Sequence, residues 1–412
     1  MAKRILHTIS QYPGKTGSGT YLQAIVKEAH KKGYRQAVIA GISKACDDVE
    51  FGKVKDVGFY PVIFETENLP FPIVGMSDVM PYKSTKYSDM SEDMFLKWEK
   101  AFKQNIILAI DEFKPDIIIA HHLWLLTSLI KKLTDIPVVS ICHGTDLRQL
   151  KLANKFKDYV TCGCDDLELV LALNDYQKKE IVENYKISEE NIHVVGGGYD
   201  QDIFYPSNIQ RQEDKIRLIY AGKISFSKGV ISLIKAYQKL YKTNKNVEVL
   251  LAGSGCGSEE NTIRQIIQST DGNIKLLGQV PHDMLGDLFR KCHIFVLPSF
   301  YEGLSLVTLE ALASGLSVVS SELPGLKKWL GKEINNSGII EYVKLPSLIG
   351  IDTPNSDDIE CFEEGLVSAI VKQIDDLEKN RLQYHKVHEK IKAFSWQRIF
   401  EKIESYIINI VS

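Results

Sequence analysis

The sequence predicts an α/β protein that contains two doubly wound domains in tandem. Short runs rich in Val, Ile and Leu alternate with longer stretches whose apolar residues recur at helical spacing. Such uninterrupted apolar runs are typical of parallel strands that are buried on both faces of a sheet. The alternation occurs twice along 412 residues, which is too long for one ordinary hydrophobic core. Together these observations indicate two parallel sheets, each covered by helices.

In the first domain, expected over residues 1–200, we predict five strands: Arg4–Ile9, Ala37–Ala40, Asp116–Ala120, Pro137–Cys142 and Leu169–Leu173. Helices are expected between them at Tyr21–Lys32 and Asp93–Glu112. In the second domain, expected over residues 201–395, the predicted strands are Ile216–Tyr220, Val247–Ala252, Ile274–Leu277, Ile294–Leu297 and Ser317–Ser320. The first of these is followed by a predicted helix, Val230–Tyr241, which contains no glycine or proline.

The boundary between the domains is predicted near residues 196–214. Three glycines at 196–198 break regular structure, and Pro206 cannot continue a central strand. A stretch at 342–358 contains two prolines and a glycine and is expected to form a long surface loop. The amphipathic segment Trp396–Ile410 is predicted to be a final helix, and residues 396–412 to pack back toward the first domain.

Composition excludes several classes of protein. The net charge is -3, so no strong positive field indicates nucleic acid as a partner. The first residues are interpreted as a strand and no apolar run is long enough to span a membrane, while seven scattered cysteines indicate a reducing, cytoplasmic compartment. Lys27, Lys31, Lys32 and Arg35 form either a solvated helix face or a peripheral contact with the inner face of a membrane.

The segment from Phe295 to Gly315 contains the strongest functional motif. A strand is followed by a short loop with Glu302 and Gly303, and then by a predicted helix over residues 305–314. The free N–H groups at the start of this helix favour a diphosphate, at Leu304, Ser305, Leu306 and Val307. Glu302 is predicted to face a sugar and Glu310 to bind a ribose. The alternative is that both are plain surface charges, although Glu310 lies in a mostly apolar helix.

A second motif follows the first strand of the second domain. Gly222 ends the strand, and Lys223 and Lys228 flank the turn into the next helix. Two ammonium groups at the carboxyl end of a strand can neutralise a diphosphate leaving group. The alternative is that they are two solvated loop lysines.

Glu302 and Glu310, with Gly222-Lys223 and Lys228-Gly229 upstream, resemble the motifs of family-four (group 1) retaining glycosyltransferases. The resemblance covers nearly the whole chain and is weakest at about 45–110 and 340–358. It implies the GT-B fold, in which two Rossmann-like domains face each other across a cleft. It also implies that Gly253 and Val280 lie beside the nucleotide. Lys223 departs from the family, which usually has arginine there, and lysine offers a point charge in place of a bidentate fork.

In the first domain the resemblance implies that Gly17 and Gly19 lie against the donor diphosphate. Gly14-Lys15-Thr16 is not a P-loop, because Ile9 stands where that motif needs glycine. The resemblance places His143 beside the transferred sugar, with a structural role as the alternative. Further acceptor contacts are expected from residues that follow two strands, with capping or packing as the alternative for the histidine pair: His121, His122, Asp146 and Arg148.

The expected function is therefore retaining transfer of a sugar from a nucleotide diphosphate, with UDP as the expected nucleotide. No cofactor is expected beyond the nucleotide sugar as co-substrate. No metal is expected either, because Asp200 and Asp202 form an Asp-x-Asp motif only within a linker. The acceptor is a small molecule, glycan, lipid or protein. Alternatives are a GT-B sugar-nucleotide epimerase, a phosphorylase, for which no pyridoxal lysine can be assigned, and a non-catalytic sugar-binding protein.

Overall fold

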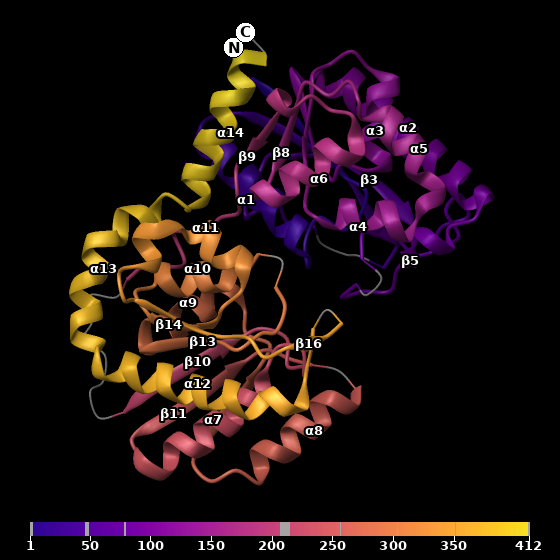
Figure 1. Ribbon diagram of the computed structural model, residues 1–412. Coiled ribbons are helices and arrows are strands. Elements are labelled where there is room, and N and C mark those ends of the chain that lie inside the picture. Colours follow the sequence, from indigo (N-terminus) through magenta and orange to yellow (C-terminus); the bar gives the residue numbers. More distant parts are fainter. Residues whose placement is uncertain are drawn as a thin grey trace. The chain divides into compact units, whose positions relative to one another are not determined.

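The computed structural model describes residues 3–45, 49–77, 80–206, 215–255, 257–302, 304–350 and 352–410. The chain divides into two compact units, Met1–Gly197 with Trp396–Ser412, and Gly198–Ser395 (Figure 1). We call them the first unit and the second unit. The break follows Gly197, inside the region where the sequence places the boundary.

A seven-stranded parallel sheet forms the centre of the first unit, in the order β3-β2-β1-β6-β7-β8-β9. Its strands are β1 (Arg4–Ile9), β2 (Arg35–Ser43), β3 (Gly58–Phe64), β6 (Ile117–His121), β7 (Val138–Ile141), β8 (Leu169–Ala172) and β9 (Ile192–Val194). A separate pair, β4 (Val74–Gly75) with β5 (Thr85–Lys86), lies in the long connection after β3. The helices are α1 (Gly17–Lys31), α2 (Glu92–Phe113), α3 (Leu125–Leu133), α4 (Thr145–Leu152), α5 (Lys157–Gly163), α6 (Asp175–Tyr185) and α14 (Trp396–Ile410).

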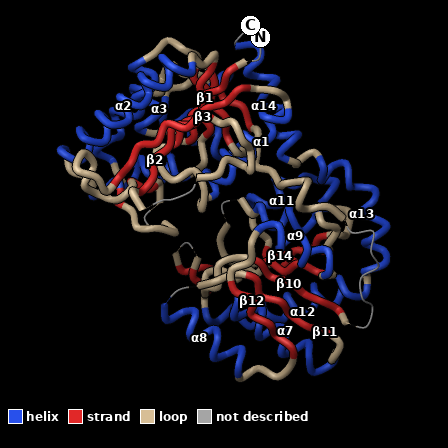
Figure 2. The backbone as a smooth tube through the Cα atoms, turned by 180° about the vertical axis from the view of Figure 1, so that it is seen from behind, coloured by secondary structure: helices blue, strands red, loops and turns tan. Residues whose placement is uncertain are grey.

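Helices cover both faces of this sheet (Figure 2). Successive strand residues point to opposite faces, so Ile5 and Leu6 of β1 enter different clusters. Ile5 packs with α1 and with Trp396 and Phe400 of α14, whereas Leu6 belongs to the cluster formed with α2 and α3. The last helix of the chain therefore completes one face of the first sheet.

A six-stranded parallel sheet forms the centre of the second unit, in the order β12-β11-β10-β13-β14-β15. Its strands are β10 (Ile216–Ala221), β11 (Val247–Ala252), β12 (Asn273–Gly278), β13 (Ile294–Leu297), β14 (Ser317–Ser321) and β15 (Ile340–Val343). The helices are α7 (Val230–Thr243), α8 (Gly257–Gln268), α9 (His282–Lys291), α10 (Leu306–Ala313), α11 (Pro324–Asn335), α12 (Ser356–Asp375) and α13 (Leu377–Lys392). Leu218 and Ile219, adjacent on β10, again enter two different clusters.

Every predicted strand is present, and three strands of the two large sheets were not predicted: β3, β9 and β15. Each of these three lies at the end of its sheet. The surface loop predicted at 342–358 is wrong at both ends, because β15 continues to Val343 and α12 begins at Ser356. Between them β16 (Leu348–Ile349) pairs with β17 (Thr353–Pro354). Pro354 is tolerated there because an isolated two-stranded pair leaves one side of each strand unbonded.

The strand order brings four loops of the second unit to one edge of its sheet. β12, β11, β10 and β13 are neighbours in that order and run parallel, so the segments after them start side by side. The order reverses between β10 and β13, and ligands of open α/β sheets bind at such reversals. In the described part of the chain, no helix combines the length and apolarity needed to cross a membrane.

Candidate functional site

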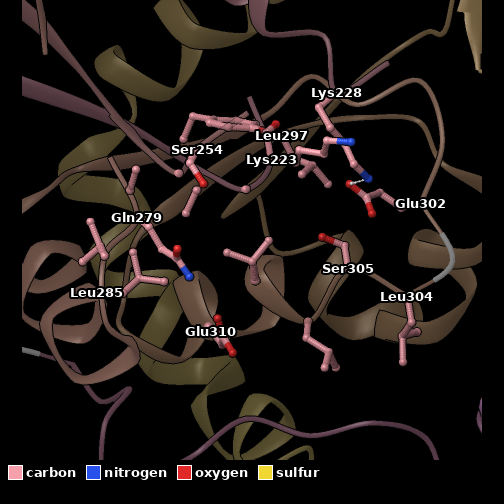
Figure 3. A pocket seen from close by; sticks show the side chains of 18 residues that line it. Lys223, Lys228, Ser254, Gln279, Leu285, Leu297, Glu302, Leu304, Ser305 and Glu310 are labelled. Atoms are coloured by element: carbon pink, nitrogen blue, oxygen red, sulfur yellow. Dashed lines mark hydrogen bonds and ion pairs between the residues drawn. The ribbon is translucent and has the colours of Figure 1, made fainter. Parts of the chain in front are cut away.

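A pocket of about 490 Å³ lies at this edge of the second sheet (Figure 3). Its walls come from the segments that follow β10, β11, β12 and β13, and from α10. All the described second-unit residues predicted for the site line it: Gly222, Lys223, Lys228, Gly253, Val280, Glu302, Leu304, Ser305, Leu306, Val307 and Glu310. Gly303 lies outside the described residues. The sequence missed other lining residues, among them Tyr220, Ser254, Gln279 and Leu285.

Lys228 and Glu302 form an ion pair at the rim of the pocket, with 2.8 Å between Nζ and Oε1 (Figure 3). Ser299 Oγ donates a second hydrogen bond to the same carboxylate oxygen at 2.8 Å. Lys228 also donates to the backbone carbonyl of Tyr301. The side chains of Lys228 and Glu302 are 26% and 19% exposed, so an anion from solvent has access to both. A pair this accessible is worth little in stability and can exchange partners at small cost.

The helix α10 begins at the floor of the pocket. Ser305 is its N-cap residue and its hydroxyl bonds to the hydroxyl of Thr308 at 2.8 Å. No acidic residue occupies the first turn, so nothing on the helix itself competes for the positive end of its dipole. The start of α10 and the ammonium of Lys228 therefore both favour negative charge in the same pocket.

Glu310 lies further along α10 and is only 7% exposed. Its Oε1 is 2.9 Å from Nε2 of His282, the first residue of α9, whose ring packs edge-on against Phe204. The surrounding protein alone would lower the pKa of His282, but the hydrogen bond and charge of Glu310, with Asp200 and Asp283, outweigh it and raise that pKa. Glu310 thus has a hydrogen-bond partner on a second helix, and its burial argues against the alternative of a solvated surface charge.

Two glycines allow the loops around the pocket to pack closely. A Cβ added to Gly253 would lie 1.8 Å from the carbonyl oxygen of Gly222, and one added to Gly229 would lie 2.0 Å from that of Pro298. Both glycines also have positive φ, 149° and 66°. Any other residue at these two positions would push apart the segments that carry Lys223, Lys228 and the start of α10.

In the first unit, Gly17 and Gly19 lie at the start of α1, where Thr16 caps the helix by accepting the N–H of Gly19. A Cβ on Gly19 would lie 2.7 Å from the backbone nitrogen of Gly14, whereas one on Gly17 would meet no atom within 4 Å. Gly19 is therefore required by packing of the Gly14–Thr20 turn. The packing around Gly17 places no such demand.

His143 follows β7 and is half-buried within a group of aromatic rings. Its Nε2 is 3.2 Å from Nδ1 of His121, and Tyr21 packs edge-on against it at 5.2 Å between ring centroids. Burial lowers the pKa of His143 to about 3, and the neighbouring His122 contributes. His143 is consequently neutral at physiological pH and cannot serve as a cationic partner for a phosphate.

Three of the predicted acceptor contacts are buried beneath His143. Asp146 is fully buried, and its carboxylate accepts the backbone N–H of His143 at 2.8 Å and faces Nδ1 of His122 at 2.5 Å. His121 and His122 are 1% and 3% exposed. The geometry therefore favours for His121 and His122 the packing role that the sequence left open, and it buries Asp146 with them, while Arg148, on α4, is exposed.

The predicted basic cluster on α1 is partly neutralised. Lys31 pairs with Glu28 at 2.9 Å, and Lys32 lies 3.6 Å from Glu404 and 3.8 Å from Glu401 of α14. These contacts favour a solvated helix face over an anionic-lipid site.

Solved structures identify the class of fold. A glycosyltransferase from Rickettsia africae superposes with a TM-score of 0.70 over 98% of both chains, at 17% identity. Anabaena HepE, solved in complex with UDP, superposes with a TM-score of 0.68 over 99% of this chain and 100% of its own, at 15% identity. The protein therefore has the GT-B fold of two Rossmann-like domains, which confirms the predicted fold class.

Sequence comparison then gives the family. Residues 15–203 match Glycosyltransferase Family 4, and residues 201–343 match Glycosyl transferases group 1. An uncharacterised glycosyltransferase of Methanocaldococcus jannaschii is 24% identical over 86% of this chain and 96% of its own length. The chain belongs to the group 1 glycosyltransferases, as its motifs predict, and the pocket in its second unit is the candidate donor site.

Proposed function

We propose that this glycosyltransferase takes a sugar from a UDP-sugar and transfers it to an acceptor with retention of anomeric configuration and without a metal ion. One observation carries the proposal: Lys228, the start of α10 and Glu310 all line one pocket at the reversal point of the second sheet. Anabaena HepE, which shares the fold, has been solved with UDP and with UDP-glucose. The family favours transfer over the epimerase and sugar-binding alternatives.

In this proposal the diphosphate of the donor displaces Glu302 as the partner of Lys228. Phosphate oxygens carry more negative charge than one carboxylate and also accept from the N–H groups at the start of α10. Glu302 is then released to accept hydrogen bonds from sugar hydroxyls. Binding of the leaving group and alignment of the sugar are thereby coupled through one ion pair.

As the bond between the sugar and the diphosphate breaks, negative charge develops on the departing phosphate oxygen. Lys228, Lys223 and the α10 dipole stabilise that charge, which is the work a metal ion would otherwise do. Glu310 holds the ribose from below, with its carboxylate oriented by His282. The acceptor hydroxyl attacks the anomeric carbon from the same face that the diphosphate leaves, and its proton passes to the leaving phosphate.

Donor turnover tests this proposal. We expect UDP release from UDP-glucose or another UDP-sugar, faster than from the GDP- and ADP-sugars, and unchanged by EDTA. The same nucleotides should raise the melting temperature, since a ligand that binds only the native state stabilises it. A rate lost on chelation and restored by a divalent ion would contradict the metal-free mechanism. With an acceptor in hand, an inverted anomeric configuration in the product would contradict retention.

A further inference from the structure

Four histidines gather beneath the candidate sugar-facing surface of the first unit: His7, His121, His122 and His143. His7 and His121 have ring centroids 6.2 Å apart, and the rings of His121 and His143 are nearly parallel, at 11°. Only His143 reaches the surface, because His7, His121 and His122 are each at most 3% exposed. The family resemblance places His143 beside the transferred sugar but assigns no part to the rings behind it.

The hydrogen bond between His121 and His143 has one proton between the two ring nitrogens that face each other. Nδ1 of His121 and Nε2 of His143 are 3.2 Å apart, so one nitrogen donates and the other accepts. Burial lowers the pKa of both rings, and each is neutral with a single N–H. The direction of this bond therefore fixes the tautomer of both histidines.

The other ring nitrogen of His121, Nε2, determines which of the two histidines donates. Its Nε2 is buried and has no hydrogen-bond partner among the residues that the structure describes. If His143 donated, His121 would have to carry its own proton on Nε2, as a buried N–H without an acceptor. If His121 donates from Nδ1, its Nε2 is only an unused lone pair. Orphaned buried N–H groups are rarer in proteins than unused acceptors, so the second arrangement is favoured.

His7 shows the same arrangement in the same cluster. Gln36 donates its amide N–H to the carbonyl of Val26 at 2.9 Å, which leaves its oxygen to face Nε2 of His7, also at 2.9 Å. Nε2 of His7 must therefore be the donor, and its Nδ1, which is buried and has no partner in the described residues, is a lone pair. The cluster thus already contains one ring whose orphan nitrogen is unprotonated.

We infer that His121 is a positioning residue that holds His143 as the neutral tautomer protonated on Nδ1. His143 then meets a ligand as a hydrogen-bond donor, and its Nε2, already accepting from His121, is not available as a base. The backbone N–H of His143 donates to Asp146, and this bond fixes the position of the backbone that carries the ring. The tautomer follows from the protein alone, while its use on a sugar hydroxyl rests on the proposed function.

Nitrogen-15 NMR of histidine-labelled protein tests the tautomer without any assay of activity. Two-bond ¹⁵N–¹H correlations distinguish Nδ1–H from Nε2–H rings, and loss of a signal in His143→Gln assigns His143. We expect His143 to be protonated on Nδ1 in the unmodified protein. A His143 ring protonated on Nε2 overturns the inference.

Two substitutions of His121 separate positioning from packing. His121→Asn keeps an N–H donor close to the place of Nδ1, whereas His121→Phe keeps a flat ring and removes the donor. We expect His121→Asn to retain the Nδ1–H signal of His143 and His121→Phe to lose it. With UDP-glucose, kcat/KM should fall about tenfold in His121→Phe, the effect of one weakened hydrogen bond, and recover in His121→Asn.

His7→Phe is the matched control, because His7 is equally buried and touches His121 but makes no hydrogen bond to His143. It should leave the His143 tautomer unchanged and kcat/KM within about twofold, even if the melting temperature falls. A tautomer change in His7→Phe equal to that in His121→Phe would contradict a specific role for His121. If the spectra agree with the inference but kcat/KM is unaffected in His121→Phe, the tautomer stands and the proposed role of His143 at the sugar fails.

Discussion

The two units place their titratable side chains in opposite ways. In the second unit Lys228 and Glu302 are partly exposed and form an ion pair across the rim of a pocket. In the first unit His7 and His121 are buried, and burial keeps them neutral. An exposed pair can exchange its partners for a charged ligand, whereas a buried neutral network is fixed before any ligand arrives. Under the proposed function, the pocket of the second unit would act by charge exchange and the histidine cluster by preorganisation.

The largest test of charge exchange is Lys228→Ala. Without this ammonium the leaving diphosphate loses one source of charge stabilisation in the transition state, and turnover of UDP-glucose should fall about 100-fold or more. Lys379→Ala is the control, because Lys379 also belongs to an exposed ion pair, with Asp376, but lies on α13 outside the pocket. Near-normal turnover in Lys228→Ala would remove Lys228 from the site.

A second test is Glu310→Gln, which keeps the shape of the side chain and removes its charge. A hydrogen bond from a ribose hydroxyl to a carboxylate is stronger than one to an amide, so the affinity for UDP should fall about tenfold. Isothermal titration measures it. Glu322→Gln is the matched control, because Glu322 pairs with Lys327 away from this pocket and its loss should leave UDP affinity unchanged. Equal affinities for all three proteins would count against the ribose contact.

The buried histidines predict how the first unit responds to acid. Burial lowers the pKa of His7 to about 4, below its ordinary value of 6.5. Between these values the unfolded chain binds a proton that the folded unit does not, so stability falls as pH decreases through this window. His7 alone should cost about 1 kcal/mol between pH 6 and pH 5. Denaturant melts at both pH values should show a smaller pH dependence in His7→Phe. An unchanged dependence would mean that His7 is not the buried neutral ring described above.

We expect the smallest effect from His282. Its contribution to stability depends on pH in the direction opposite to that of His7. Its pKa is raised in the fold by Glu310 against the opposing influence of the surrounding protein, so its contribution to stability is present below pH 6.5 and is lost as pH rises through the higher folded value. Because 44% of its side chain is exposed, the contribution should stay below about 1 kcal/mol. Comparing unfolding of the native chain and His282→Gln at pH 6 and pH 8 measures it. If the stability contributed by His282 increased with pH, its pKa would be lowered in the folded protein and not raised.

The sequence could bring the charged residues of the second-unit pocket together because they follow strands that neighbour one another. Glu302 and Lys228 stand in loops after β13 and β10, and the order of parallel strands brings those loops together. Gln279 and Ser254 were missed, because an uncharged polar residue after a strand does not by itself indicate a binding site. The sequence also could not predict how deeply a side chain is buried. Asp146 looks like a surface acid at the start of a helix, yet it is fully buried.

The strands that the sequence missed share a physical cause. β3, β9 and β15 lie at sheet ends, where one side of a strand has no neighbour and the apolar pattern is weaker. β3 even contains Pro61, which an end strand tolerates and a central strand does not. Of the four strands at the ends of the two large sheets, periodicity identified only β12, whereas it identified all the central strands.

The return of α14 to the first unit has a consequence for how the chain is made. Trp396, Phe400 and Ile403 fill one face of a sheet whose strands all belong to the first 197 residues. During synthesis on the ribosome α1 covers only part of that face until α14 emerges, whereas the second unit is continuous and has all its parts sooner. The half of the protein that is translated first is thus the last to be completed, and a nascent chain stalled before residue 396 exposes an apolar surface for chaperones to bind.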